Sequence, residues 1–241
     1  MTSGRAAVKR FQGPRFQEPV QPEDLLGPLN DVERRNAPKW LYLAGDRQLL
    51  RIAPRVSIVG TRDASANGLK RASRLARELV SEEVVVVSGL ARGIDTAAHR
   101  AAMKSRGRTI AVLGTPINRA YPRENAELQA LIMEEHLVVS QFPSGHPATR
   151  SNFPRRNRTM ALLTDATVIV EASEGSGSLS QGWEALRLGR RLFIMRAAAE
   201  DAALSWPREM MKYGAEILTR TEELLEALPL GVGASLDSLA L

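Results

Sequence analysis

Cysteine is absent from the 241-residue sequence, and histidine occurs only three times, at scattered positions. Without cysteine there can be no disulfide framework and no cysteine-based metal site, and the histidines lack metal-binding spacing. A chain without cysteine suits a reducing compartment. We therefore expect an intracellular, cytoplasmic protein with no metal and no other cofactor.

Long apolar stretches are also missing. No segment approaches the roughly 20 apolar residues that span a bilayer, and no apolar core follows the basic N-terminus as it would in a secretory signal. Neither Gly-x-Gly-x-x-Gly after the first core strand nor Gly-x-x-x-x-Gly-Lys-Ser/Thr occurs. These absences predict a soluble protein with no membrane partner, without the dinucleotide fingerprint and outside the P-loop ATPases.

Positive charge, by contrast, is in excess. The chain has 33 lysines and arginines against 27 acidic residues, which gives a formal net charge of +6. This excess favours an anionic partner, although a basic solvated surface would give the same balance.

Short β-branched runs alternate with amphipathic segments along most of the chain. The expected strands are residues 40–44, 55–59, 84–87, 109–113, 137–142, 166–170, 192–195 and 216–218. The expected helices are residues 67–81, 97–105, 126–135, 156–163, 180–188, 207–213 and 222–228. This alternation predicts an α/β fold with a doubly wound, mostly parallel sheet in a three-layer α/β/α arrangement. We expect residues 1–38 to be a flexible segment, residues 39–230 to form the main domain, and residues 231–241 to be a loose tail.

Glycine and polar residues follow four of the expected strands. The four strings are Gly60-Thr61-Arg62, Ser88-Gly89 through Arg92-Gly93, Gly114-Thr115, and Gly175-Ser176-Gly177-Ser178. Glycine lets a ligand approach the backbone, and amides at helix N-termini bind phosphate. Because parallel strands end at the same edge of a sheet, these four loops predict a site for a phosphate-rich ligand there.

A basic segment with one aromatic residue joins this edge. Arg155, Arg156 and Arg158 would bring positive charge to the strand ends, and Phe153 offers a ring on which a base can stack. Two other interpretations stay open for these residues. Phe153 would also suit the core, and one of the arginines would also suit an internal ion pair with Glu171 or Asp165.

Several strings, in one order, resemble the successive motifs of the DprA/Smf family. They are Val59-Gly60-Thr61-Arg62, Ser88-Gly89-x-Ala91-Arg92-Gly93-Ile94-Asp95, Ala111-Val112-Leu113-Gly114, Tyr121-Pro122-x-x-Asn125, Asn152-Phe153-Pro154-Arg155-Arg156-Asn157-Arg158 and Val170-Glu171-Ala172…Ser176-Gly177-Ser178-Leu179. The resemblance covers roughly residues 41–189. It implies an extended Rossmann-like fold for the main domain.

The resemblance also implies a function without catalytic turnover. The family binds and protects single-stranded DNA, helps to load the RecA recombinase during natural transformation, and commonly forms dimers. Single-stranded DNA, RecA and a second copy of the chain are therefore the candidate partners. The candidate DNA- or phosphate-binding residues are Gly60, Thr61, Arg62, Ser88, Gly89, Arg92, Gly114, Phe153, Arg155, Arg156, Asn157, Arg158, Gly175, Ser176, Gly177 and Ser178.

The sequence departs from the family pattern at several places. Pro116 and Ile117 stand where a second glycine and its neighbour are usual, which puts a ligand contact in that loop in question. Arg196 and three alanines replace a Pro-Gly turn. The short ends leave no room for the helical and winged-helix modules of many members, so we expect a minimal member.

Two alternative functions stay open. The segment from Arg156 to Ser178 is also similar to the Lonely Guy phosphoribohydrolases, which place a catalytic glutamate soon after the glycine-rich loop. Gln181 stands about there and cannot act as a general base, while Glu184 lies nearly one helical turn further on. This favours nucleotide binding over hydrolysis within that alternative. The third hypothesis is a protein-interaction module that uses the fold only as a scaffold.

Overall fold

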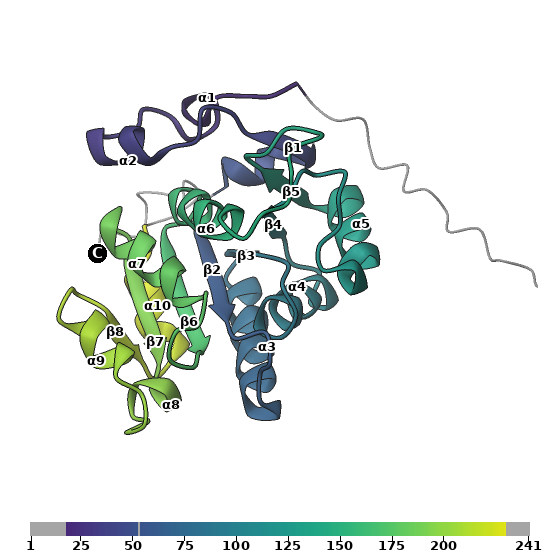
Figure 1. Cartoon of the computed structure of the whole chain (residues 1–241). Helices are drawn as coiled ribbons and strands as arrows, with labels where there is room; N and C mark the ends of the chain where they lie inside the picture. The colour runs from purple at the N-terminus through teal and green to yellow at the C-terminus, as the bar shows by residue number, and fades with distance from the viewer. Residues whose placement is uncertain (1–17, 53, 230–241) are drawn as a thin grey trace, which may run out of the picture.

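The protein is described by a computed structural model that covers residues 18–52 and 54–229 (Figure 1). Within these residues the strands are β1 (Tyr42–Gly45), β2 (Arg55–Gly60), β3 (Val85–Ser88), β4 (Thr109–Leu113), β5 (Leu137–Ser140), β6 (Ala166–Glu171), β7 (Arg191–Met195) and β8 (Glu216–Leu218). They form one sheet in the order β1-β5-β4-β3-β2-β6-β7-β8.

Each of these strands overlaps one that the sequence predicted, and the predicted α/β fold is confirmed. All neighbouring pairs are parallel except β1 and β5, which are antiparallel. The strand order reverses direction along the sheet between β2 and β6, which is where a doubly wound sheet opens a crevice at the carboxyl ends of its strands.

The helices connect these strands. The α-helices of the described residues are α1 (Pro22–Leu26), α2 (Asp31–Asn36), α3 (Ala66–Ser81), α4 (Ile94–Lys104), α5 (Ala126–Glu135), α6 (Asn152–Leu162), α7 (Leu179–Arg187), α8 (Arg196–Ala199), α9 (Trp206–Met211) and α10 (Thr221–Glu226). Two short 3-10 helices, η1 (Arg47–Leu50) and η2 (Arg123–Asn125), precede β2 and α5.

Two helices, α4 and α6, begin three or more residues earlier than expected. The sequence predicted a helix from residue 97, whereas α4 starts at Ile94 with Gly93 as its N-cap, so that Asp95 lies in its first turn. Likewise α6 starts at Asn152 and not at Arg156, so that Phe153 lies in its first turn. The extra turn of α6 places Phe153 and Arg156 on one rigid element.

The sheet is covered on both faces, as the alternation of its buried side chains requires. Val84 and Val86 pack in one core cluster with side chains of α3, α4 and α10. Val85 and Val87 point to the other face and pack in a cluster that contains side chains of α6 and α9. Figure 1 shows α3 and α4 on the opposite side of the strands from α6 and α7. The predicted three-layer arrangement is therefore confirmed.

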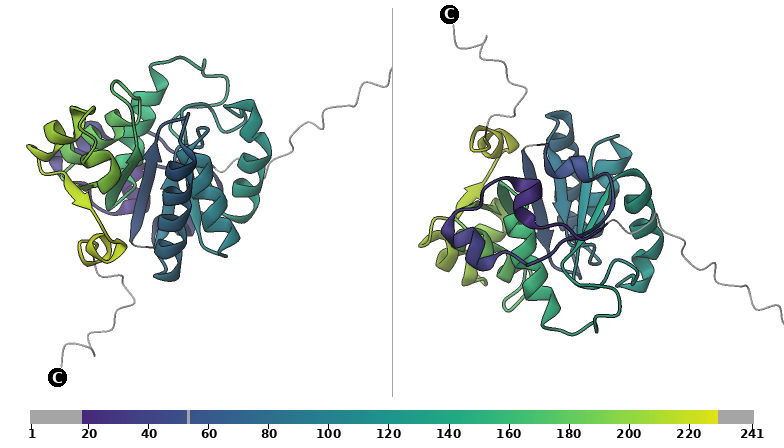
Figure 2. Two further views of the ribbon diagram at one scale, coloured as in Figure 1. Left: turned by 90° about the horizontal axis from the view of Figure 1, so that it is seen from below. Right: turned by 90° about the horizontal axis from the view of Figure 1, so that it is seen from above.

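Part of the predicted flexible N-terminal segment is ordered. Residues 18–38 contain α1 and α2, and Figure 2 (right) shows this purple segment lying across the molecule. Leu25 is buried in the cluster that contains the α6 side chains, and Leu29 packs against Ala161, Leu162 and Leu188. The prediction of flexibility is thus wrong for residues 18–38, while residues 1–17 and the predicted tail at 231–241 lie outside the described residues. The domain boundaries themselves stay a prediction.

None of the helices in residues 18–52 and 54–229 is both long enough and apolar enough to cross a membrane.

Candidate functional site

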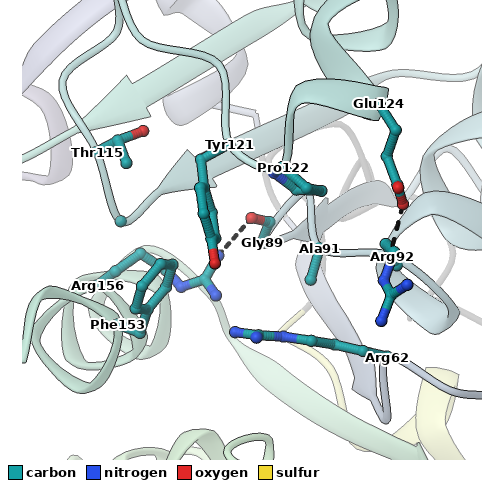
Figure 3. A pocket seen from close by; sticks show the side chains of 11 residues that line it. Arg62, Gly89, Ala91, Arg92, Thr115, Tyr121, Pro122, Glu124, Phe153 and Arg156 are labelled. Atoms are coloured by element: carbon teal, nitrogen blue, oxygen red, sulfur yellow. Dashed lines mark hydrogen bonds and ion pairs between the residues drawn. The ribbon is translucent and has the colours of Figure 1, made fainter. Parts of the chain in front are cut away.

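The carboxyl ends of β2, β3 and β4 enclose a cavity of about 260 Å³. Arg62, Phe153 and Arg156 line it, and the same three residues also line an adjoining cavity of about 360 Å³ at the ends of β2 and β6. Figure 3 shows Arg62 reaching from its loop toward Phe153, with Arg156 beside the phenylalanine ring. The two cavities form the candidate site, and α6 provides their common wall.

Arg156 is a deeply buried charged group of this site, with only 7% of its surface exposed. Its Nη1 donates to the carbonyl oxygens of Gly89 and Val112, the latter at 2.8 Å, and its Nε donates to Asn157 Oδ1 at 2.9 Å. It therefore ties α6 to the ends of β3 and β4. Burial lowers the pKa of Arg156, and the nearby Asp95 carboxylate opposes that shift.

Asp95 is the counter-charge of Arg156 and is 5% exposed. Its Oδ2 accepts a hydrogen bond from the Ala91 amide at 3.2 Å, which fixes the loop between β3 and α4. Burial raises the pKa of Asp95, while the positive charge of Arg156 and the loop amides lower it. Arg156 and Asp95 thus belong to one buried electrostatic network beneath the cavities.

Gly89 and Gly114, which line the smaller cavity, also have a packing role that the sequence did not predict. The sequence suggested that they let a ligand approach the backbone, but the space beside them is filled by α6. A Cβ on Gly89 would lie 2.5 Å from Cζ of Arg156, and one on Gly114 would lie 2.7 Å from Cδ1 of Phe153. These glycines admit the two α6 side chains to the strand ends.

We expect Gly89→Ala to lower the free energy of unfolding by about 1 to 3 kcal/mol, because the added methyl group overpacks the buried Arg156 guanidinium. Urea unfolding of parent and variant measures this difference. Gly177→Ala is the matched control, since a Cβ there meets no atom within 4 Å and should leave the stability almost unchanged. Equal effects of the two substitutions would contradict the packing role of Gly89.

Phe153 is only partly buried, so the interpretation as a core ring does not describe it. Its ring centroid lies 5.6 Å from Cζ of Arg62 and 5.4 Å from the ring centroid of Tyr121. Tyr121 is 43% exposed and was not among the predicted site residues, although its Tyr-Pro motif was visible in the sequence. An aromatic pair beside an exposed guanidinium is suited to stack a base and contact its phosphate.

The three predicted arginines of α6 lie in three different environments, and only Arg156 lines the cavities. Arg155 is exposed and lies over the Phe142 ring at 5.1 Å, and it lines neither cavity. Arg158 pairs with Glu184 at 3.2 Å. An internal ion pair was expected for one arginine, but its partner is neither Glu171 nor Asp165, which instead pair with arginines outside α6.

The remaining predicted residues divide between the cavities. Ser88 is fully buried, and its hydroxyl donates to the Ile58 carbonyl at 2.6 Å, so that its side chain is engaged within the sheet. Gly89, Arg92 and Gly114 line the smaller cavity. The larger cavity is lined by Gly60, Thr61, Asn157, Ser176, Gly177 and Ser178. Gly175 is not among the lining residues of either.

Glu184 lines neither cavity. It is 7% exposed and pairs with Arg158 and with Arg187, at 3.2 Å and 3.4 Å. Gln181 lines the larger cavity, but its amide cannot act as a general base. Groups of three or more His, Cys, Asp or Glu that could hold a metal ion are absent from the part of the chain that the structure describes.

The N-terminus of α3, directly after the first parallel strand, is occupied from within the chain. Glu171 accepts hydrogen bonds from the Ser65 amide at 2.8 Å and from the Ser65 hydroxyl at 2.6 Å. A Cβ on Gly68 would lie 2.9 Å from the Glu171 carboxyl carbon, so the first turn of α3 closes tightly over this carboxylate. Its negative charge satisfies the positive end of the helix dipole.

The chain is similar in sequence to proteins of a known family. A family model described as DNA recombination-mediator protein A matches residues 20–229. The DNA processing protein DprA of Bacillus subtilis (strain 168) is 34% identical over 192 residues, which are 80% of this chain and 65% of that protein. The chain spans about half the length of several other curated relatives.

Two solved structures are also similar. The X-ray structure of DprA from Streptococcus pneumoniae has a TM-score of 0.77 and 34% sequence identity, covering 92% of this chain and 77% of that one. A structure of DprA from Helicobacter pylori, which concerns the single-stranded DNA binding mode of that protein, has a TM-score of 0.75 and 25% identity. It covers 88% of this chain and 94% of that one.

Proposed function

The chain belongs to the DNA recombination-mediator protein A family, that of the DprA and Smf proteins, and on this premise we propose that it binds single-stranded DNA at the two cavities. A base would stack on Phe153 and Tyr121 in the smaller cavity, and the backbone phosphates would be held by Arg62. Arg156 would add positive charge from below, at the border of both cavities.

The observation that carries this proposal is the environment of the Arg62 side chain. Its side chain is exposed beside the Phe153 ring, and it forms no ion pair with any carboxylate of residues 18–52 and 54–229. An exposed arginine next to an aromatic platform offers both a phosphate contact and a stacking surface. The formal charge of +6 gives the whole chain the same preference for a polyanion.

We expect Arg62→Ala to weaken binding of a labelled oligo-dT strand about tenfold and to reduce the slope of log affinity against log salt by about 0.7, the value for one single-strand phosphate contact. Fluorescence anisotropy over a salt series measures both quantities. Arg77→Ala is the matched control, because Arg77 is exposed on α3 and lines neither cavity. Parent-like binding by Arg62→Ala would rule out this site.

We further propose that the chain acts without catalytic turnover. The hydrolase alternative depended on Glu184, and the ion pairs of Glu184 with Arg158 and Arg187 keep it from the cavities. RecA and a second copy of the chain stay predicted partners, and a cytoplasmic location and a role in natural transformation stay predictions with them. If the protein released a free base from a nucleoside monophosphate and Glu184→Ala abolished that release, the enzyme alternative would be supported instead.

A further inference from the structure

One arginine of the predicted site is already neutralised by the protein itself. Arg92 Nη2 lies 3.1 Å from Asp63 Oδ1, and Arg92 Nε lies 3.8 Å from Glu124 Oε1. Asp63 and Arg92 lie in the loops after β2 and β3, and Glu124 lies in η2; we call these three residues the acidic bridge. The Arg92–Glu124 pair is drawn as a dashed line in Figure 3.

The acidic bridge forms one rim of the smaller cavity. Arg92 and Glu124 line that cavity together with Arg62, and the same three residues line a shallow hollow of about 440 Å³ on the outer side. Asp63 and the exposed Leu69 also line this hollow. A strand that left the cavity in this direction would therefore cross the acidic bridge.

The charges of the acidic bridge oppose such a path. It carries two carboxylates and one guanidinium, a net charge of −1, whereas Arg62 on the adjoining wall is free of ion pairs within the described residues. A phosphate that contacted the remaining N–H groups of Arg92 would lie close to both carboxylates. Like charges at such short range repel strongly even beside solvent.

We propose that Asp63 and Glu124 determine the path of the bound strand. They keep its phosphates away from Arg92 and thereby hold the affinity for single-stranded DNA below its maximum. This inference rests on the proposed function. The two carboxylates confine the strand to the side of the cavity formed by Arg62 and Phe153. Arg92, although it belongs to a motif that suggests phosphate binding, contributes little to affinity while the acidic bridge is intact.

The fold does not depend on this bridge. The Arg92 side chain is 50% exposed, and those of Asp63 and Glu124 are 85% and 56% exposed. Ion pairs with this exposure contribute little to folding stability. Substitutions that remove only the negative charges should therefore leave the protein folded, so that a change in affinity reports on the charges.

We expect Glu124→Gln and Asp63→Asn each to tighten oligo-dT binding about threefold to tenfold and to steepen the salt dependence toward one further phosphate contact. Fluorescence anisotropy at several salt concentrations measures both. Glu134→Gln is the matched control, with the same change of charge on the exposed face of α5 near its other end, and its affinity should match that of the parent.

A double-mutant cycle tests whether the gain acts through Arg92. Arg92→Ala should weaken binding less than about threefold in the parent, but about tenfold when both carboxylates have been neutralised. Unchanged or weaker binding by the Glu124→Gln and Asp63→Asn variants would overturn the inference, as would equal effects of Arg92→Ala in the two backgrounds.

Failure of this inference can be told apart from failure of the proposed function. If the parent itself fails to bind oligo-dT at low salt, the proposed function fails. If the parent binds and the neutralised variants do not bind more tightly, only this inference fails.

Discussion

Arg156→Ala is expected to lower the free energy of unfolding by about 3 to 5 kcal/mol, because it removes several buried hydrogen bonds and the positive charge that favours the buried Asp95 carboxylate. The substitution leaves Asp95 buried without its counter-charge and frees the carbonyl oxygens of Gly89 and Val112. Unfolding in urea, followed by circular dichroism, measures the loss. A loss of this size is a large fraction of the stability of an ordinary domain.

Arg158→Ala is the control for this variant, two residues further along α6. Arg158 is more exposed, and its partner Glu184 keeps a second ion pair with Arg187 at 3.4 Å. We expect a loss of no more than about 1 kcal/mol there. Similar losses in the two variants would show that the Arg156 network does not stabilise the fold as described. The comparison also bears on DNA binding, because weak binding by Arg156→Ala would reflect damage to the fold as well as a lost cation.

Acidification is expected to destabilise the protein through His99, by about 3 kcal/mol between pH 7 and pH 4. Burial lowers the pKa of His99 from 6.5 to about 3, and the positive charges of His136 and Arg156 add to this shift. Above pH 6.5 the imidazole is neutral in both the folded and the unfolded chain. Between pH 6.5 and about 3 only the unfolded chain takes up the proton, so stability falls as the pH falls through that window.

Urea unfolding at a series of pH values, for the parent and for His99→Gln, isolates this contribution. Asp95 acts in the opposite direction, because burial raises its pKa and the folded chain takes up that proton first. The informative quantity is therefore the difference between parent and variant, which should shrink toward acid pH. A constant difference from pH 7 to pH 4 would contradict the assignment to His99.

The strands could be predicted because their signal is local. Runs such as Val84–Val87 are fully buried on both faces of a parallel sheet, so nearly every residue is apolar and β-branched. The N-terminal helices α1 and α2 could not be predicted in the same way. They have 5 and 6 residues, and their order depends on contacts of Leu25 and Leu29 with distant parts of the chain.

The candidate site was predictable in its location but not in its internal roles. Glycines after strands indicated the correct edge of the sheet, because loops of a parallel sheet meet there. The sequence does not reveal that Gly89 and Gly114 make room for side chains of α6, since this depends on how helix and sheet pack. For the same reason it does not reveal that Arg158 faces Glu184 while Arg156 faces the cavities.

Glu171 affects which phosphate-bearing molecules can bind at the N-terminus of α3. A cell is crowded with free nucleotides, and a helix N-terminus after the first parallel strand is where such folds usually receive their phosphates. In this chain the Glu171 carboxylate fills that position, where it accepts hydrogen bonds from the amide and the hydroxyl of Ser65. The positions left open to a phosphate are therefore the two cavities that Arg62 and Phe153 line, and the larger of them lies between the ends of β2 and β6.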